Sequence, residues 1–463
     1  MKRVLQHSAL AMAVAGGLLA AAPAHAITNV EANAGPQFNF VNPGARSLGM
    51  AGAFVGLADD STAAYTNPAG LAQLTRREFA AEARYTQFHT LSSFGGRLLD
   101  EPTGVGLDTV SGLIEQETTR DVANLSFLSF AFPLEHGTIA VYRHELANFE
   151  AEFASQGAFA QNIGDDVTPA RVARVIPTTN NIDLEIQNYG LAGSWRVGDK
   201  LMLGGSLNYF HFDIDTETFR YDLDADGNGV VTNIERLTVV DFSDAALRDE
   251  LEQFGADDGW GFTLGMLWIP NDKWSVGAVY RRGPDFDYRF RSRVLGNVIE
   301  AGRTDFVVPD VLAVGVGFRP SDAWRISFDL AHVAYSQHAD NVVEQSTVGE
   351  VDYLGLDDTI EARLGAEYTN INAENPYSLR FGVWHEPAHQ IEFLGEATPF
   401  TGTPLGVPAS RRNTKATQFI EGRDALHVTA GYGVVFKKFQ VDAAVDLSKS
   451  SDVLSVSLVY FFE

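Results

Sequence analysis

The chain contains 463 residues, of which 60 are acidic and 34 are basic, and it has no cysteine. The acidic excess argues against nucleic acid as a partner, because such binding requires basic residues that neutralise phosphates. No disulfide can hold the fold together, and no segment beyond the N-terminal region approaches the roughly 18 uninterrupted apolar residues of a membrane-spanning helix. A helical membrane protein is therefore excluded, whereas a closed, hydrogen-bonded sheet remains compatible with the composition.

The first 26 residues have the pattern of a cleaved export signal. A basic pair, Lys2 and Arg3, precedes an apolar stretch over 9–22, and residues 24–26 match an A-x-A cleavage site. The apolar stretch is too short to span a bilayer comfortably. We predict that residues 1–26 are removed and that the mature chain starts near Ile27.

Residues 44–71 form a Gly- and Ala-rich run that carries an acidic pair and closes on Asn67, Pro68, Ala69 and Gly70. This run resembles the N-terminal signature of the outer-membrane long-chain fatty acid transporter family (FadL-like, OMPP1/TodX), whose relatives also import aromatic hydrocarbons. The resemblance implies that residues 27–78 form a plug, or hatch, inside a β-barrel, with Asn67 to Gly70 in the gate. The alternative is a Gly/Ala-rich helix and turn of an unrelated secreted protein.

From about residue 79 onward, the sequence consists of segments in which apolar and polar residues alternate. Trp324, Ile326 and Phe328 fall on one face of such a segment, whereas Arg325 and Asp329 fall on the other. One apolar and one charged face is the pattern of a transmembrane barrel, with lipid outside and a polar lumen inside. A soluble sandwich would place the apolar face inward, and periodicity alone does not separate the two folds.

The spacing of these segments favours an all-β, antiparallel transmembrane barrel over residues 79–463. We predict about fourteen strands, an even number as in bacterial single-chain barrels. Short turns, as at 133–137, alternate with long loops, as at 220–257, which is typical of outer-membrane barrels. The predicted strands span 79–90, 122–133, 137–150, 182–197, 200–219, 258–270, 273–293, 304–319, 323–337, 357–369, 376–387, 423–436, 438–448 and 452–462.

The tryptophans and the final strand agree with this interpretation. All six tryptophans are predicted at strand ends, where the aromatic girdles of membrane barrels lie. The last strand alternates and ends in aromatic residues, which resembles the C-terminal signal of outer-membrane proteins, although Glu463 follows the last aromatic.

One long loop carries a complete calcium-binding pattern, D-x-[DN]-x-[DN]-G-x5-E. Calcium takes oxygen ligands from side chains and from one backbone carbonyl, and a segment from Ser243 with helical capping features follows the loop. We predict a Ca²⁺-stabilised extracellular loop, the alternative being an acidic, Gly-rich turn. The predicted ligands are Asp224, Asp226, Asn228, the Val230 carbonyl, Thr232 through a water molecule, and Glu235.

Enzyme signatures give little support for catalysis. His385-Glu386-Pro387-Ala388-His389 matches the H-E-x-x-H zinc-protease motif, but Pro387 disfavours the helix that this motif requires. The sequence contains no G-x-S-x-G elbow and no phosphate-binding loop. We therefore predict that the protein is not an enzyme and has no organic cofactor.

Charged residues on the inward faces of the strands are the remaining candidates for function. We predict that Arg325, Arg363 and Arg380 bind ligand, because an arginine can hold a carboxylate through two hydrogen bonds. The alternative is a paired network that only stabilises the lumen.

These patterns predict a porin-like protein of the Gram-negative outer membrane that transports hydrophobic compounds passively. The resemblance implies that ligand is captured among the extracellular loops, passes a movable plug and leaves sideways through a gap in the wall. The expected partners are hydrophobic small molecules, outer-membrane lipid and lipopolysaccharide, which divalent cations bridge. The alternative function is a non-transporting barrel that serves a secretion system or forms a surface scaffold.

Overall fold

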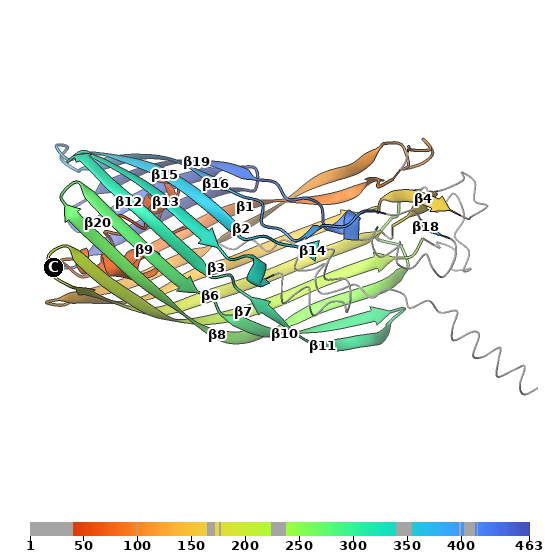
Figure 1. Cartoon of the computed structure of the whole chain (residues 1–463), viewed down its shortest axis with the longest axis horizontal. Helices are drawn as coiled ribbons and strands as arrows, with labels where there is room; N and C mark the ends of the chain where they lie inside the picture. The colour runs from red at the N-terminus through yellow and green to blue at the C-terminus, as the bar shows by residue number, and fades with distance from the viewer. Residues whose placement is uncertain are drawn as a thin grey trace, which may run out of the picture.

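The computed structural model describes residues 40–99, 101–163, 172–175, 177–223, 238–338, 354–397, 400–401, 413 and 415–463. The predicted signal peptide and all six predicted calcium ligands lie outside these residues. Within them, one sheet closes into a barrel whose last strand pairs with its first (Figure 1). No described helix has the length and apolar character needed to cross a membrane.

The barrel wall contains fourteen antiparallel strands, as predicted. Two of them are interrupted, so that β9 and β10 form one strand and β11 and β12 form the next. Short segments β4 (Phe159–Ile163), β5 (Val172–Arg174), β14 (Leu354–Gly355), β17 (Glu392–Phe393) and β18 (Phe400–Thr401) lie outside the wall. The wall consists of β1 (Glu78–Arg97), β2 (Gly112–Pro133), β3 (Gly137–Ser155), β6 (Thr178–Arg196), β7 (Leu201–Tyr221), β8 (Leu247–Asn271), β9 (Trp274–Arg282), β10 (Asp285–Val294), β11 (Asn297–Val307), β12 (Val311–Ser321), β13 (Trp324–Val333), β15 (Thr359–Asn370), β16 (Tyr377–Glu386), β19 (Ala425–Val435), β20 (Phe439–Leu447) and β21 (Ser451–Phe461).

The alternation within the strands sorts side chains between the outside of the barrel and its lumen. On β13, Phe328 is 45% exposed on the outside, whereas its neighbour Asp329 is 1% exposed inside. The outward apolar residues of all wall strands form a belt around the barrel, which is the surface that a lipid bilayer covers. The prediction of an apolar outside and a polar inside is therefore confirmed.

Five of the six tryptophans lie on the outside of this belt, and one does not. Trp195, Trp268, Trp274 and Trp324 are exposed near the short turns, and Trp260 is exposed near the opposite end of the belt. The sixth, Trp384, is only 4% exposed because its position on β16 faces the lumen. The prediction that all six tryptophans belong to girdles is wrong for this residue.

Beyond the belt, toward the long loops, the outside of the wall becomes acidic. Glu150, Asp183 and Asp215 lie directly opposite one another on β3, β6 and β7. Partial burial and the neighbouring carboxylates raise the pKa of Asp183, which lies outside the membrane-spanning part of β6. Side-by-side carboxylates are unfavourable in a sheet, so this face marks where the wall leaves the membrane for water.

Several strands extend beyond the belt, so the loops between them are shorter than predicted. β2 begins at Gly112 rather than near 122, and β8 begins at Leu247 rather than near 258. The helix predicted from Ser243 is therefore wrong, because the chain turns at 242–244 and then enters β8. Above the belt neither face of a strand is uniformly apolar, so alternation no longer reveals the strand.

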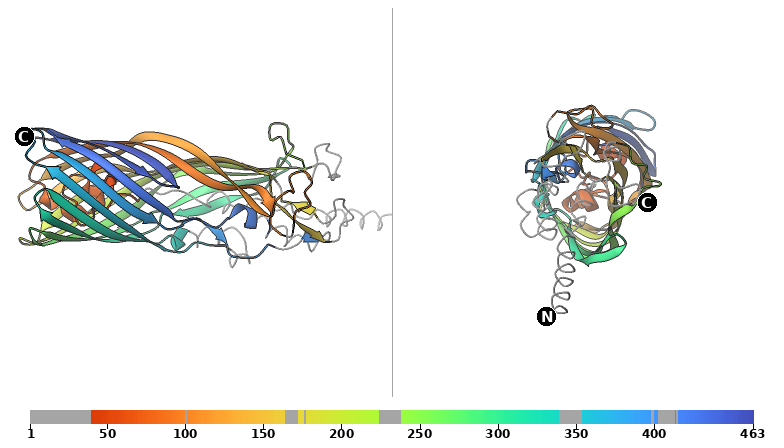
Figure 2. Two further views of the ribbon diagram at one scale, coloured as in Figure 1. Left: turned by 90° about the horizontal axis from the view of Figure 1, so that it is seen from above. Right: turned by 90° about the vertical axis from the view of Figure 1, so that its right-hand side faces the viewer.

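The N-terminal described residues fill the lumen. Residues 40–77, here called the lumen segment, contain α3 (Ala45–Leu48), α4 (Ala63–Thr66) and the 3-10 turn η1 (Pro68–Gln73). Seen along the barrel axis, this segment lies inside the ring of strands (Figure 2). Its residues from Phe40 to Leu74 are almost all buried, and the wall begins at Glu78.

Candidate functional site

Glycines on the inner face of the wall let the backbone of the lumen segment approach the strands. A Cβ atom added to Gly365 would lie 2.6 Å from the Cβ of Met50, and one added to Gly382 would lie 2.6 Å from the Ala51 nitrogen. Neither distance is possible for real atoms, so only glycine fits at these positions. These residues, here called the wall glycines, are Gly204, Gly265, Gly277, Gly315, Gly317, Gly365, Gly382 and Gly431.

Asn67, Pro68 and Ala69 lie against β7, β8 and β9, where three wall glycines make room for them, whereas Gly70 packs against Ala58 of the lumen segment. The Asn67 amide donates hydrogen bonds to the carbonyl oxygens of Val55 and Met266, both at 3.0 Å. Its oxygen accepts a bond from the Ala69 nitrogen and so caps η1. The motif thus joins two parts of the lumen segment to the wall.

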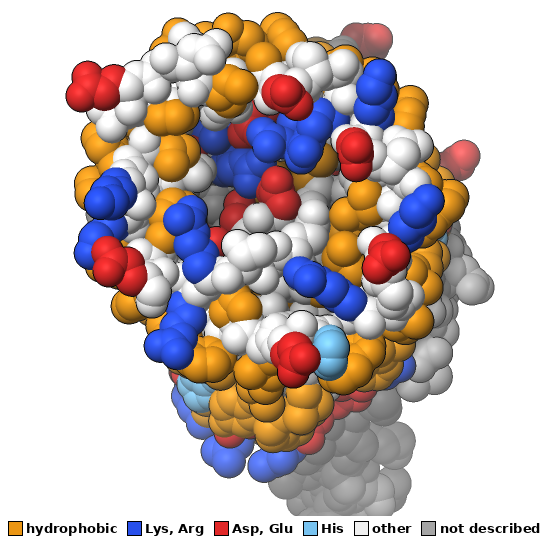
Figure 3. Space-filling view, turned by 90° about the vertical axis from the view of Figure 1, so that its left-hand side faces the viewer, with side chains coloured by type: hydrophobic (Ala, Val, Ile, Leu, Met, Phe, Trp, Pro, Cys, Tyr) orange, Lys and Arg blue, Asp and Glu red, His pale blue; other side chains and the backbone are white. Residues whose placement is uncertain are grey.

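Below the lumen segment, toward the short turns, one carboxylate binds three arginines. Glu367 accepts hydrogen bonds from Arg46 at 3.0 Å, Arg325 at 2.8 Å and Arg380 at 2.7 Å. Arg380 also donates to Asp442 at 2.7 Å. Viewed from this end, basic and acidic side chains gather in the central hollow (Figure 3). The network joins the lumen segment, through Arg46, to the wall.

The acidic pair of the lumen segment takes part in the same network. Arg46 binds Asp59 at 2.6 Å and Asp60 at 3.1 Å. Burial would raise both pKa values, but the Arg46 charge holds the pKa of Asp59 below its usual value, whereas that of Asp60 stays raised. Arg46 thus joins Asp59 and Asp60 of the lumen segment to Glu367 on β15.

The three arginines predicted to bind ligand occupy two different places. Arg325 and Arg380 both contact Glu367 and lie in the network described above. Arg363 is bonded to Glu361, stacks on Trp384 at 4.2 Å, and lines a pocket on the other side of the lumen segment. The structure therefore brings Arg325 and Arg380 together and separates them from Arg363.

An outer cavity of about 600 Å³ opens toward the long loops. It is bordered by β1, β3, β6, the end of β16 and the β20–β21 turn, and it combines apolar and polar side chains. Phe153 of β3 lies in its wall. The apolar part of the lining comes mainly from Leu91, Phe149, Phe153, Ile182, Ile391 and Ile420.

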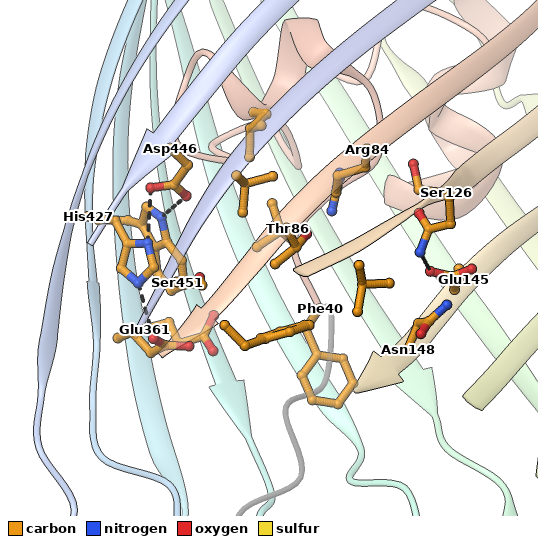
Figure 4. A pocket seen from close by; sticks show the side chains of 18 of the residues that line it. Phe40, Arg84, Thr86, Ser126, Glu145, Asn148, Glu361, His427, Asp446 and Ser451 are labelled. Carbon is orange, nitrogen blue, oxygen red and sulfur yellow. Dashed lines mark hydrogen bonds and ion pairs between the residues drawn. The ribbon is translucent and has the colours of Figure 1, made fainter. Parts of the chain in front are cut away.

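A smaller inner pocket of about 90 Å³ lies between the outer cavity and the lumen segment. Figure 4 shows Phe40 of the lumen segment on one side and side chains of β1, β2, β3, β19 and β20 around it. Glu386 lines both spaces, so the outer cavity and the inner pocket are neighbours. The inner pocket combines charged and amide side chains with apolar ones and is large enough only for a small chemical group.

Arg84 is the functional candidate that the sequence did not reveal. Its side chain lines the inner pocket, while its Nε and Nη2 atoms hold Glu82 at 3.2 and 2.8 Å. Glu82 also accepts bonds from the Gly44 nitrogen at 2.9 Å and the Ser455 hydroxyl at 2.5 Å. The alternation of residues near position 80 places Glu82 and Arg84 on the inner face of the strand, and this pattern is the sequence signal that could have identified them.

At the border of the two spaces, His427 lies between two carboxylates. Its Nδ1 atom is 3.0 Å from Asp446 and its Nε2 atom is 3.0 Å from Glu386, with the Ser450 hydroxyl at 3.3 Å. These spacings resemble a Ser–His–Asp triad, but the Ser450 hydroxyl donates to Glu386 at 2.8 Å, and each ring nitrogen of His427 faces a carboxylate. Through these contacts the cluster joins β16, β19 and β20.

The H-E-x-x-H motif has no metal-binding geometry. β16 ends at Glu386, His385 faces Asp424 at 3.2 Å, and His389 stacks on Tyr335 at 4.7 Å. The helix that a zinc protease needs is not formed. In the part of the chain that the structure describes, no group of three or more His, Cys, Asp or Glu residues is placed to hold a metal ion.

The ladder between β2 and β3 is incomplete. These strands pair only from Phe127, opposite His144, down to Pro133, opposite Thr138. Above this point β2 remains paired with β1, and β3 remains paired with β6. Among the described residues, 112–126 of β2 and 145–155 of β3 form no backbone pairs with each other. We call this part of the wall the β2–β3 seam.

A closed barrel with a lipid-facing belt and a filled lumen defines the class of outer-membrane β-barrels. Residues 25–390 match the family described as outer membrane protein transport protein (OMPP1/FadL/TodX), and the chain belongs to this family. A comparison with curated proteins gave no match.

Solved structures of this family share the fold at low sequence identity. A Pseudomonas aeruginosa FadL homologue is 13% identical, with a TM-score of 0.59 over 92% of this chain and 99% of that chain. The Ralstonia pickettii toluene transporter TbuX is 15% identical, with a TM-score of 0.52 over 92% and 100%. The Pseudomonas putida toluene transporter TodX is 13% identical, with a TM-score of 0.51 over 92% and 99%.

Proposed function

We propose that the chain is a passive outer-membrane channel for hydrophobic compounds, either long-chain fatty acids or aromatic hydrocarbons. The observation that carries this proposal is the succession of the outer cavity and the inner pocket above the lumen segment. Two neighbouring spaces of decreasing size offer a ligand a path from the long-loop end into the barrel. The lumen segment acts as the plug that blocks a straight aqueous path.

The lining of the two spaces suggests how an amphiphilic ligand is oriented. The outer cavity offers several large apolar side chains to a hydrocarbon tail, whereas the inner pocket presents charged and amide side chains to a head group. The β2–β3 seam borders the inner pocket and provides a sideways exit at the outer edge of the apolar belt. Such an exit spares an apolar ligand from crossing the polar network below the lumen segment.

Uptake assays test this function. Cells that lack their own transporter, with and without the protein, are given radiolabelled oleate and radiolabelled toluene. Uptake of either probe above that of cells without the protein supports a channel. A correctly folded barrel that imports neither probe would favour the alternative of a secretion-system component or scaffold.

The Arg84 side chain provides a test of the substrate class. We expect Arg84→Lys to lower oleate uptake about tenfold, because lysine keeps the charge beside Glu82 but loses the second donor edge that would hold a carboxylate. Toluene has no carboxylate, so its uptake should not change. The matched control is Arg325→Lys, since Arg325 lies outside both spaces. Equal oleate uptake by Arg84→Lys and wild type would show that Arg84 does not hold the head group.

We also propose that residues 1–26 are removed on export, that lipopolysaccharide surrounds the acidic outer wall, and that the 224–235 loop binds Ca²⁺. The residue pattern alone supports the calcium site. Calorimetric titration of the purified protein with Ca²⁺ should show heat of binding that Glu235→Ala removes, because the bidentate carboxylate contributes two ligand oxygens. Heat that survives Glu235→Ala would place the ion elsewhere.

A further inference from the structure

The hairpin of β10 and β11 concentrates positive charge on the outside of an acidic protein. The chain has a net charge of −26, and the outer faces of β3, β6 and β7 carry aligned carboxylates. Phe286 and Phe306 bury the inner face of the hairpin, so the arginines that alternate with such residues point outward (Figure 1). Together with the last residue of β9, these arginines are here called the arginine strip: Arg282, Arg289, Arg291, Arg293 and Arg303.

The arginine strip begins at the outer edge of the apolar belt. On β8, Trp260 is 62% exposed and Phe262 is 39% exposed near this edge. Arg282 lies directly opposite Phe262, and Arg289 lies opposite Phe254, which is further out on β8. Exposed aromatic residues of this kind mark the boundary between acyl chains and head groups. The strip therefore lies where the head groups of the outer leaflet surround the wall.

Two arginines of the strip face each other across the hairpin. Arg289 and Arg303 are direct partners in the β10–β11 ladder, and like charges at such positions repel each other. In the part of the chain that the structure describes, Arg289 forms no hydrogen bond or ion pair with the protein. Arg303 reaches only Asp287, at 3.9 Å. An anion held between the two guanidinium groups would relieve their repulsion.

Arg282, at the lower end of the strip, is also weakly held. Its nitrogens are 4.0 Å from both Asp285 and Asp310, and its side chain is 50% exposed. Asp310 already accepts hydrogen bonds from the Tyr280 hydroxyl at 2.6 Å and the Gly283 nitrogen at 3.0 Å. Arg282 borders a cavity of about 340 Å³ at the point where the wall strands are interrupted. Its donors are therefore available to a group that enters from the membrane side.

The other two arginines of the strip are neutralised by carboxylates of the protein. Arg291 donates to Glu252 at 3.0 Å, and Arg293 donates to Glu250 at 2.6 Å. Their contacts fix the hairpin to β8 and leave Arg282, Arg289 and Arg303 as the donors that an external anion can use.

We propose that Arg282, Arg289 and Arg303 bind the phosphates of lipopolysaccharide in the outer leaflet. A guanidinium presents two parallel donors to a phosphate, which is why arginine suits this contact better than lysine. The carboxylates on β3, β6 and β7 would repel the same phosphates unless a divalent cation lay between them. The strip is thus the side of the barrel that holds lipopolysaccharide directly. This inference does not depend on what the barrel transports.

Binding of fluorescent lipopolysaccharide to the purified full-length protein in detergent tests the site. EDTA in the buffer removes the divalent cations that would bridge lipopolysaccharide to the acidic faces. We expect Arg289→Gln with Arg303→Gln to weaken binding at least tenfold, because the phosphate loses its charged donors. Neither arginine has a short contact within the protein, so the barrel should stay folded, as heat-modifiable migration in gels will show. Dephosphorylated lipopolysaccharide should bind wild type as weakly as intact lipopolysaccharide binds the double variant.

The matched control is Arg120→Gln with Arg423→Gln, which removes the same charge from exposed residues outside the strip. This control should keep the affinity of wild type. Equal affinities of the strip variant and wild type would overturn the proposal, and so would undiminished binding of dephosphorylated lipopolysaccharide. Equal affinity of wild type for fluorescent phosphatidylglycerol would also overturn it, in favour of anionic lipid in general. A strip variant that binds lipopolysaccharide normally but changes oligomeric state in light scattering would assign the strip to the acidic face of a second copy instead.

Discussion

Glu367→Ala is expected to release the lumen segment from the wall and to lower the stability of the protein by about 3–5 kcal/mol. The substitution removes the one carboxylate that Arg46, Arg325 and Arg380 all contact, and only Arg46 and Arg380 keep another carboxylate partner among the described residues. Removing one partner from a buried ion pair costs more than the pair contributes, because the remaining charges stay desolvated. Mutual repulsion of the three arginines adds to this cost.

Two measurements follow the effect of Glu367→Ala. Denaturant unfolding in detergent should show the loss of stability, and planar-bilayer recordings should show ion conductance that the wild type lacks. Glu374→Ala is the control, since this carboxylate is exposed in the neighbouring turn. A variant that stays closed and as stable as wild type would show that the network does not anchor the lumen segment.

Gly365→Val is expected to prevent the lumen segment from seating while leaving the barrel able to form. Even a methyl group at this position would overlap Met50, and valine adds two more carbons. Overpacking of this kind costs about 1–3 kcal/mol where neighbours can adjust, and here a backbone atom of Met50 lies in the way. The belt on the outside of β15 is unchanged, so the barrel still inserts.

Limited proteolysis and conductance distinguish Gly365→Val from wild type. The displaced lumen segment should become cleavable while the strands remain protected, and the barrel should conduct ions. Gly193→Val serves as the control, because a Cβ at Gly193 meets no other atom within 4 Å. An uncleaved, non-conducting Gly365→Val protein would contradict a tight fit between this glycine and the lumen segment.

Residue alternation was sufficient to predict the wall where one face touches lipid. The six wall strands β13, β15, β16, β19, β20 and β21 begin and end within a few residues of their predicted positions. The upper parts of β2 and β8 were not predicted because they extend beyond the belt into water. Neither of their faces is uniformly apolar there, so residue alternation does not reveal the strands. Trp384 was misplaced for a related reason, since nearness to a strand end does not decide which face a residue occupies.

The candidate site was less predictable than the wall. Alternation correctly placed Arg325, Arg363 and Arg380 in the lumen, but it carries no information about their depth. Their separation into two groups depends on strand register and on where the lumen segment lies, which are properties of the closed barrel. The β2–β3 seam is invisible in the sequence because it is an absence of pairing between two otherwise regular strands.

The contacts of Glu82 have a consequence for the order in which the protein assembles. This single carboxylate joins the lumen segment at Gly44, its own strand β1, and Ser455 on the last strand. Glu82 has all of these partners only when the lumen segment is seated and the last strand is paired with β1. Seating of the lumen segment and closure of the barrel therefore stabilise each other, because both bring a hydrogen-bond donor to the same carboxylate.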